Sequence, residues 1–328
     1  AIYGMGVIVG PTLGPPLGGY IVDRFSWPFI FYINIPIGII AALLTLSFIK
    51  SPKYGVKLKA NQVDWLGIFF LSAFIGSLQF VLEHGQQDDW FNDPVIVTLS
   101  VVSFFGLLFF IWRELTYEHP IVNLRVLKDS NLRIGTIMCF ILGFGLYGST
   151  FIIPIYTQSI LGWSATDAGL LLIPSSITTG IMMPFIGKMI QKGIPQTYLV
   201  AAGFFVFFAF TYWMHLVITP DSGEEHMYWP LILRGVGLGL LFVPITTLSL
   251  STLTGKHIGE GAAFTGMMRQ LGGSFGIAII TTYIARINQE HRVNMIGYLD
   301  NTSFEVQQRV HQLQMGFMSK GYAMNEAL

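Results

Sequence analysis

Long apolar stretches alternate with short polar ones along the whole 328-residue chain. A membrane-spanning helix needs about 20 mostly apolar residues, because the hydrocarbon core of a bilayer is about 30 Å thick. Nine stretches meet this test, at 1–22, 29–49, 65–82, 94–112, 134–160, 168–190, 197–217, 229–253 and 261–285. The pattern therefore predicts an all-α membrane protein, a polytopic helical bundle with about nine transmembrane helices.

The composition excludes a water-exposed globular protein. Charged residues make up 11% of the chain and apolar residues 52%, whereas soluble domains carry about a quarter of their residues as charges. The formal net charge is zero, so nothing favours nucleic acid as a partner. The single cysteine, Cys139, excludes an internal disulfide and a cysteine-based metal cluster. We therefore expect the lipid bilayer as the principal surrounding and neither metal nor cofactor.

Basic residues are strongly biased towards one set of alternate loops. That set contains eleven of them: Lys50, Lys53, Lys57, Lys59, Arg113, Arg125, Lys128, Arg133, Lys188, Lys192 and Lys256. The opposite short loops contain only Arg24. Because cytoplasmic loops carry the excess of Lys and Arg, the first set is predicted to face the cytoplasm. The chain opens inside a hydrophobic stretch without a Met, so we expect further spans upstream.

The first predicted span has an unusual pattern of glycine and proline. Gly6, Gly10, Gly14 and Gly18 recur every four residues and share one helix face, beside Pro15 and Gly19. A face without side chains allows another helix to approach closely, and proline bends or weakens a helix. Spacing alone is equally compatible with tight helix packing and with a moving part.

These residues carry a resemblance to a known family. The run from Gly10 to Gly19 resembles the antiporter signature in the fifth helix of drug:proton antiporters of the major facilitator superfamily. The following run from Trp27 to Gly38 resembles the stretch that leads into the sixth helix, with Pro28 where the family commonly has Arg. Further similar runs lie at 89–91, 120–124 and 269–276. Together they resemble the fourteen-helix branch of EmrB/QacA-like multidrug exporters.

The resemblance implies a division of the chain. Residues 1–50 would be the end of an N-terminal bundle, equivalent to helices 5 and 6, and 51–133 an extra helix pair with cytoplasmic linkers. Residues 134–285 would be a C-terminal bundle equivalent to helices 9 to 13. Residues 286–328 would form an extracytoplasmic loop before a last helix that this chain lacks.

The resemblance also implies a function: secondary active export of lipophilic drugs or toxic compounds by alternating access, in the bacterial inner membrane. The proton gradient would supply the energy, and the proton-coupling acid and its partner Arg would lie in helices absent from this chain. A periplasmic adaptor and an outer-membrane channel would be partners in a Gram-negative source. Alternatives are a facilitator-superfamily importer, a siderophore or metabolite exporter, and, outside transport, a membrane receptor or enzyme.

Eight residues are candidates for a transport pathway. Ionisable residues inside spans are costly, which singles out Arg269 beside Gln270, and Arg234. Arg269 is equally compatible with a structural ion pair, and Arg234 with extension of its side chain to the outer interface. Aromatic, amide and thioether groups could form a cavity for lipophilic compounds or simply pack: Tyr147, Phe151, Tyr156, Gln158 and Met182.

Overall fold

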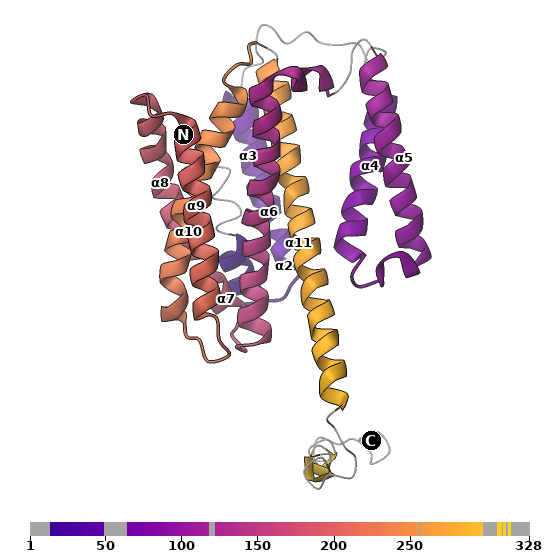
Figure 1. The fold of residues 1–328 in the computed structure, drawn as a ribbon, viewed down its shortest axis with the longest axis vertical. Coiled ribbons are helices and arrows are strands. Elements are labelled where there is room, and N and C mark those ends of the chain that lie inside the picture. Colours follow the sequence, from indigo (N-terminus) through magenta and orange to yellow (C-terminus); the bar gives the residue numbers. More distant parts are fainter. Residues whose placement is uncertain are drawn as a thin grey trace. The chain divides into compact units, whose positions relative to one another are not determined.

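The computed structural model describes residues 14–48, 64–117, 122–255 and 257–297, with 307–309, 311–312 and 314–315. Every regular element in those ranges is helical, which confirms the predicted all-α class (Figure 1). Residues 14–24 form a helix that precedes the labelled elements. The labelled elements are α2 (Phe29–Tyr32), α3 (Asn34–Phe48), α4 (Trp65–His84), η2 (Trp90–Asn92), α5 (Pro94–Thr116), η3 (Leu124–Lys128), α6 (Ser130–Ser159), α7 (Ala165–Leu170), α8 (Ile173–Gln191), α9 (Gln196–Val217), α10 (Glu224–Leu250) and α11 (His257–Gly297).

Seven of the nine predicted spans are confirmed as helices long and apolar enough to cross a membrane. They are Phe29–Phe48, Trp65–His84, Pro94–Thr116, Ser130–Ser159, Ala165–Gln191, Gln196–Val217 and Glu224–Leu250. The first predicted span, 1–22, begins outside the described residues. The last predicted span lies in α11, a helix of 41 residues. It is long enough to cross a membrane but not apolar enough to be counted among the seven. The physical reason is the sequence around Arg269 and Gln270, where polar groups and glycines replace apolar side chains.

Acidic and hydroxyl side chains mark where the helices begin. The Asp64 carboxylate accepts a hydrogen bond from the Gly67 N–H at the start of α4, and Asp93 and Asp129 cap α5 and α6 in the same way. Ser164 accepts from the Asp167 N–H at the start of α7. Such caps satisfy N–H groups that the first helical turn leaves without partners. These four helices therefore begin directly after a residue whose side chain caps the first turn.

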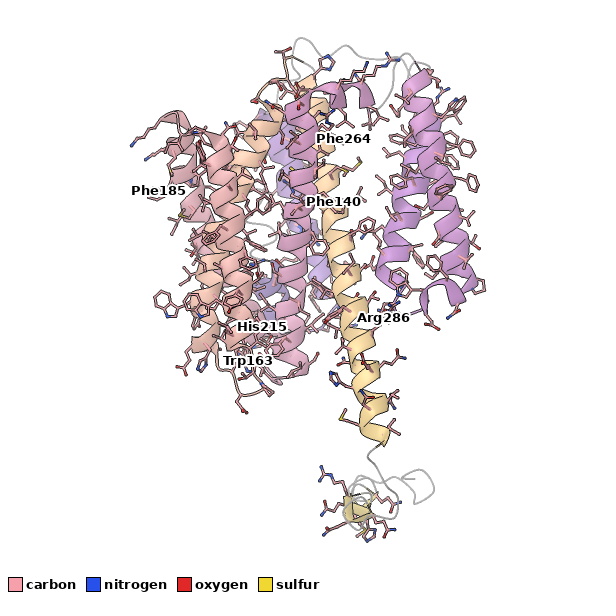
Figure 2. All side chains as sticks on the ribbon, viewed as in Figure 1. Phe140, Trp163, Phe185, His215, Phe264 and Arg286 are labelled. Atoms are coloured by element: carbon pink, nitrogen blue, oxygen red, sulfur yellow. The ribbon has the colours of Figure 1, made fainter. Side chains whose placement is uncertain are left out.

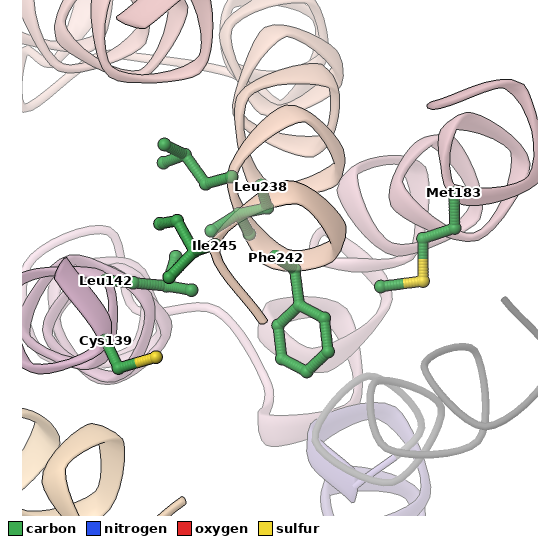
Figure 3. Close-up of a cluster of buried hydrophobic side chains, with 7 residues drawn as sticks. Cys139, Leu142, Met183, Leu238, Phe242 and Ile245 are labelled. Carbon is green, nitrogen blue, oxygen red and sulfur yellow. The ribbon is translucent and has the colours of Figure 1, made fainter. Parts of the chain in front are cut away.

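Helix α10 is the centre of the bundle formed with α6, α8 and α9. It packs against all three, and 61% of its most apolar window is buried, compared with none of the window in Phe29–Phe48. Side chains from three helices meet in one apolar cluster, drawn in Figure 3 as Cys139, Leu142, Met183, Leu238, Phe242 and Ile245. The buried position of α10 explains why substitutions there would affect packing more than substitutions in the outer helices.

Alternate connections of this bundle lie at the same end. In Figure 2, Trp163, which lies between α6 and α7, and His215, near the end of α9, are at one end, while Phe185 of α8 lies towards the other. This alternation is the arrangement that the loop charges predict. We refer to the end with Trp163 and His215 as the outer end.

Helices α4 and α5 form an antiparallel hairpin over the residues where the extra pair is expected. The Ser103 hydroxyl donates to the Phe74 carbonyl at 3.2 Å, and the Arg113 guanidinium contacts the buried Asp64 carboxylate at 3.0 Å. The outward faces carry exposed aromatic side chains, including Phe104 and Trp112. Because such faces are unfavourable in water, they are suited to lipid.

The chain divides into two compact units, Ala1–Ala278 and Ile279–Leu328, with the boundary inside α11. The four-part division expected from the resemblance, with limits after residues 50, 133 and 285, stays a prediction.

Candidate functional site

The glycine and proline segment touches α7 backbone to backbone. A Cβ atom added at Gly19 would overlap the carbonyl of Ala165, and one added at Gly169 would lie 2.6 Å from the Pro15 carbonyl oxygen. Contacts this close are open only to residues without a Cβ. The 14–24 helix and α7, far apart in the sequence, therefore meet through glycines contributed by both sides.

Of the predicted motif, Pro15 and Gly19 make this contact. A Cβ at Gly14 or at Gly18 would have no atom of the described residues within 4 Å, and their part in packing stays a prediction. Gly6 and Gly10 lie outside the described residues. The regular spacing of the glycines identified the helix, and the neighbouring Gly19 is the residue that packs.

A carboxylate reinforces the same contact. The Asp23 side chain accepts two hydrogen bonds from Thr166, one from the backbone N–H at 2.8 Å and one from the hydroxyl at 2.6 Å. Thr166 lies in the first turn of α7, where free N–H groups favour a negative charge. The Thr166 hydroxyl, and then its N–H, hold the pKa of the Asp23 carboxyl below its ordinary value of 3.8. We call the pairs Gly19–Ala165, Pro15–Gly169 and Asp23–Thr166 the outer contact.

The lowered pKa makes a prediction about pH. Because the contact lowers the pKa of Asp23, the ionised carboxylate stabilises the contact at pH values above the ordinary pKa of 3.8. This stabilisation is lost only as the pH falls below that value, so Asp23 stays ionised between pH 6 and 8. We expect Asp23→Asn to shift the separation of spin labels at positions 25 and 160 equally at pH 6 and pH 8. Electron resonance distances on the full-length protein would test this. A variant that lost the pH response of the unmodified protein would contradict it, because Asp23 would then be the titrating group.

Arg234 is buried inside the bundle. The guanidinium donates to the Ser149 hydroxyl at 2.9 Å and the Ser175 hydroxyl at 3.0 Å. It also donates to the Leu146 carbonyl at 3.3 Å and to the Thr150 hydroxyl. With 3% of Arg234 exposed, the interpretation that it extends to the outer interface is wrong. The reason is tertiary: α6 and α8 bring hydroxyls to all three of its nitrogens, so the charge needs no water.

Helices α6 and α11 are in close backbone contact. A Cβ at Gly143 would overlap the Arg269 carbonyl, and a Cβ at Gly272 would overlap the Phe140 carbonyl. The two contacts are one turn apart on each helix, so they fix both the distance and the register of the pair. The α6–α11 contact thus fixes the position of the Arg269 main chain.

The side chain of Arg269 lies over an aromatic ring. Its guanidinium carbon is 4.8 Å from the centroid of the Phe242 ring, in a cation–π contact between α11 and α10. The residue is partly exposed, and among the residues that the structure describes no hydrogen bond or ion pair of its side chain is found. Among the described residues, Arg234 therefore donates hydrogen bonds from all three nitrogens, whereas Arg269 donates none from its side chain.

The other predicted pathway residues do not gather at one place. Tyr147 packs against Gly273 beside Arg269, and Met182 lies against Gly239 of α10. The Tyr156 hydroxyl instead donates to the Thr219 carbonyl at 2.6 Å, at the outer end. Phe151 is half-buried, and Gln158 and Gln270 are exposed. Their part in transport stays a prediction.

Sequence reasoning missed the contribution of small hydroxyl residues. Ser149, Thr150 and Ser175 hold Arg234, and Thr166 holds Asp23. Hydroxyls inside apolar stretches were a signal that could have pointed to a buried charge. They did not identify the charge, because the partners lie on other helices.

A shallow pocket lies at the opposite end from the outer contact. It has a volume of about 340 Å³ and is lined by Asn123, Arg125, Val126, Asp129, Leu253 and His257. The Asp129 carboxylate caps α6 and accepts from the Thr252 hydroxyl at 2.8 Å. The backbone N–H of Leu132, followed by that hydroxyl, lowers the pKa of Asp129. These donors already occupy the Asp129 carboxylate. The hydrogen bond from Thr252 connects the start of α6 to the α10–α11 connection. The described residues contain no cluster suited to a metal ion.

Comparison with known proteins places this geometry in context. The family profile of the Major Facilitator Superfamily matches residues 1–277. The chain is 33% identical to the multidrug export protein EmrB of Escherichia coli K12 over 96% of its own length and 61% of that protein. It is 33% identical to the fatty acid resistance protein FarB of Neisseria gonorrhoeae, over 99% of the chain and 63% of FarB. The lincomycin resistance protein LmrB of Listeria monocytogenes is 28% identical, over 86% and 59%. The chain thus spans about three fifths of the length of these relatives.

Proposed function

This chain belongs to the major facilitator superfamily, and from that membership we propose that the protein exports lipophilic compounds in exchange for protons. The seven helices and the family together make it an integral membrane protein of the bacterial inner membrane and a transporter rather than an enzyme. The names of its relatives, which include multidrug export and drug resistance proteins, support the direction of transport.

The observation that carries the proposal is the outer contact. A transporter that works by alternating access must close one side of the membrane while the other is open. The outer contact joins the 14–24 helix to α7, 143 residues apart at Asp23 and Thr166. The pairs that define it are close backbone contacts at Gly19 and Gly169 and the hydrogen bonds of one exposed carboxylate. Such a surface can close tightly and separate without the repacking of a core.

We propose that the proton gradient supplies the energy and that no cofactor is bound. The acidic residues of the described spans lie at or near helix ends, as with Asp93, Glu114 and Glu224. The resemblance assigns proton coupling to an acid in a helix that this chain does not contain. A periplasmic adaptor and an outer-membrane channel are proposed partners in a Gram-negative source, on the same resemblance.

A test of the proposed function uses the full-length protein in cells that lack their own efflux pumps. We expect lower accumulation of at least one lipophilic dye from a panel that includes ethidium, a neutral dye and an anionic dye. A protonophore should restore accumulation to the level of cells without the protein. If no dye in the panel responds to the protein, export of lipophilic compounds is excluded. Continued export at an abolished proton gradient would exclude proton coupling.

A further inference from the structure

Arg234 of α10 and Arg269 of α11 use their hydrogen-bond donors differently. Three nitrogens of Arg234 donate to four oxygen atoms of α6 and α8. Arg269 makes a cation–π contact with Phe242 and, within the described ranges, neither a hydrogen bond nor an ion pair. All three nitrogens of Arg234 thus have acceptors, whereas the donors of Arg269 have none among the described residues.

The donors of Arg269 have no partner among the residues that the structure describes. A guanidinium group carries its five N–H bonds in its own plane, and the carbon of this one lies 4.8 Å from the centroid of the Phe242 ring. The in-plane edge can then donate two parallel hydrogen bonds to a carboxylate or a sulfonate. The close α6–α11 contact at Gly143 and Gly272 holds the main chain of Arg269, so the group is positioned in advance.

The surroundings of Arg269 favour an anion with an apolar body. The Phe242 ring is 5% exposed and belongs to the apolar cluster with Cys139, Leu142 and Met183. The carboxylates of the described residues lie near helix ends, and no ion pair joins any of them to Arg269. A charge inside a span with no counter-ion among the described residues is costly, and a second cation would be repelled. A negatively charged, amphipathic molecule satisfies both requirements.

We infer that Arg269 selects anionic amphipathic substrates, with the anionic group at the guanidinium and the apolar body along the Phe242 cluster. This inference rests on the proposed export function and specifies its substrate class. It reverses the expectation from the aromatic and methionine residues alone, which favour flat lipophilic cations.

The test compares two probes that differ in charge and share a ring system. Full-length protein in proteoliposomes, with an imposed proton gradient, is given pyrene-1-sulfonate or (pyren-1-ylmethyl)trimethylammonium. We expect a lower KM for the sulfonate. Arg269→Gln should raise the KM for the sulfonate about 10- to 100-fold, the usual value of a charge-assisted contact, and should leave the KM for the cation equal or lower. Arg269→Lys, which retains the charge without the planar pair of donors, should lie between them.

Arg133→Gln is the matched control, because it removes an exposed arginine at the start of α6. It should leave both KM values unchanged. Equal transport of the sulfonate by the Arg269→Gln and Arg133→Gln variants would overturn the inference, as would a preference of the unmodified protein for the cation. In either case proton-driven transport of the cation would leave the export function intact. Transport of neither probe by the unmodified protein would count against export itself.

Discussion

Gly19→Ala is expected to lower proton-driven export about tenfold or more. The added methyl group would overlap the Ala165 carbonyl, which belongs to the main chain of α7 and cannot rotate away as a side chain could. Overpacking of this kind costs roughly 1–3 kcal/mol, which reduces the population of the closed outer contact about 5- to 150-fold. A transporter that rarely closes its outer side rarely completes the cycle.

The adjacent glycine supplies the control for this prediction. Gly18→Ala is the same chemical change in the same helix, and its methyl group would have no atom of the described residues within 4 Å. Initial rates of export, measured at equal protein levels, should therefore be near the unmodified value for Gly18→Ala and near background for Gly19→Ala. Equal rates for the two variants would show that the outer contact is not part of the cycle.

A second variant on the other side of the contact distinguishes a local effect from a general one. Gly169→Ala places a methyl group 2.6 Å from the Pro15 carbonyl oxygen, so it should reduce export in the same way. Because both variants disrupt one surface, the double variant should be little worse than either single one.

The spans could be predicted because a bilayer imposes a length that apolar stretches must match. Trp65–His84 and Gln196–Val217, for example, begin and end within a few residues of the expected limits. α11 is the informative exception. It contains Arg269, Gln270 and a glycine pair, and these lower its apolar character while its length is ample. Polar groups inside a span are tolerated when neighbouring helices cover them, which a count along the sequence cannot detect.

The sequence predicted which residues would be unusual in the candidate site, but not which residues they contact. Periodicity identified a helix with a bare face, but the partner of Gly19 is Ala165, which lies in a different part of the chain. Likewise, the sequence marked Arg234 as costly inside a span and suggested that it extends to the outer interface, whereas Ser149 and Ser175 became its partners through the packing of α6 and α8 against α10. Both cases depend on tertiary neighbours, and a single sequence contains no record of which segments are neighbours.

The second large effect concerns stability and is expected at Gly272. Gly272→Ala would place a methyl group on the Phe140 carbonyl of α6, where two main chains are already in contact. Replacing a helical glycine by alanine normally stabilises by about 0.5–1 kcal/mol, so the clash must exceed this gain before any loss is seen. With an overpacking cost of roughly 1–3 kcal/mol, the sum ranges from neutral to about 2.5 kcal/mol of destabilisation. We expect the upper part of that range, because a main-chain carbonyl cannot adopt another rotamer.

Gly266 provides the matched position on the same helix. A methyl group added there would have no atom of the described residues within 4 Å, so Gly266→Ala should raise the thermal midpoint of the detergent-purified, full-length protein slightly. Gly272→Ala should lower that midpoint by several degrees, and Gly143→Ala, which acts on the Arg269 carbonyl from the other side, should do the same. Midpoints that rise at all three positions would contradict the close α6–α11 contact. The position of Arg269 would then lose its support, since the same contact holds the main chain from which its side chain extends.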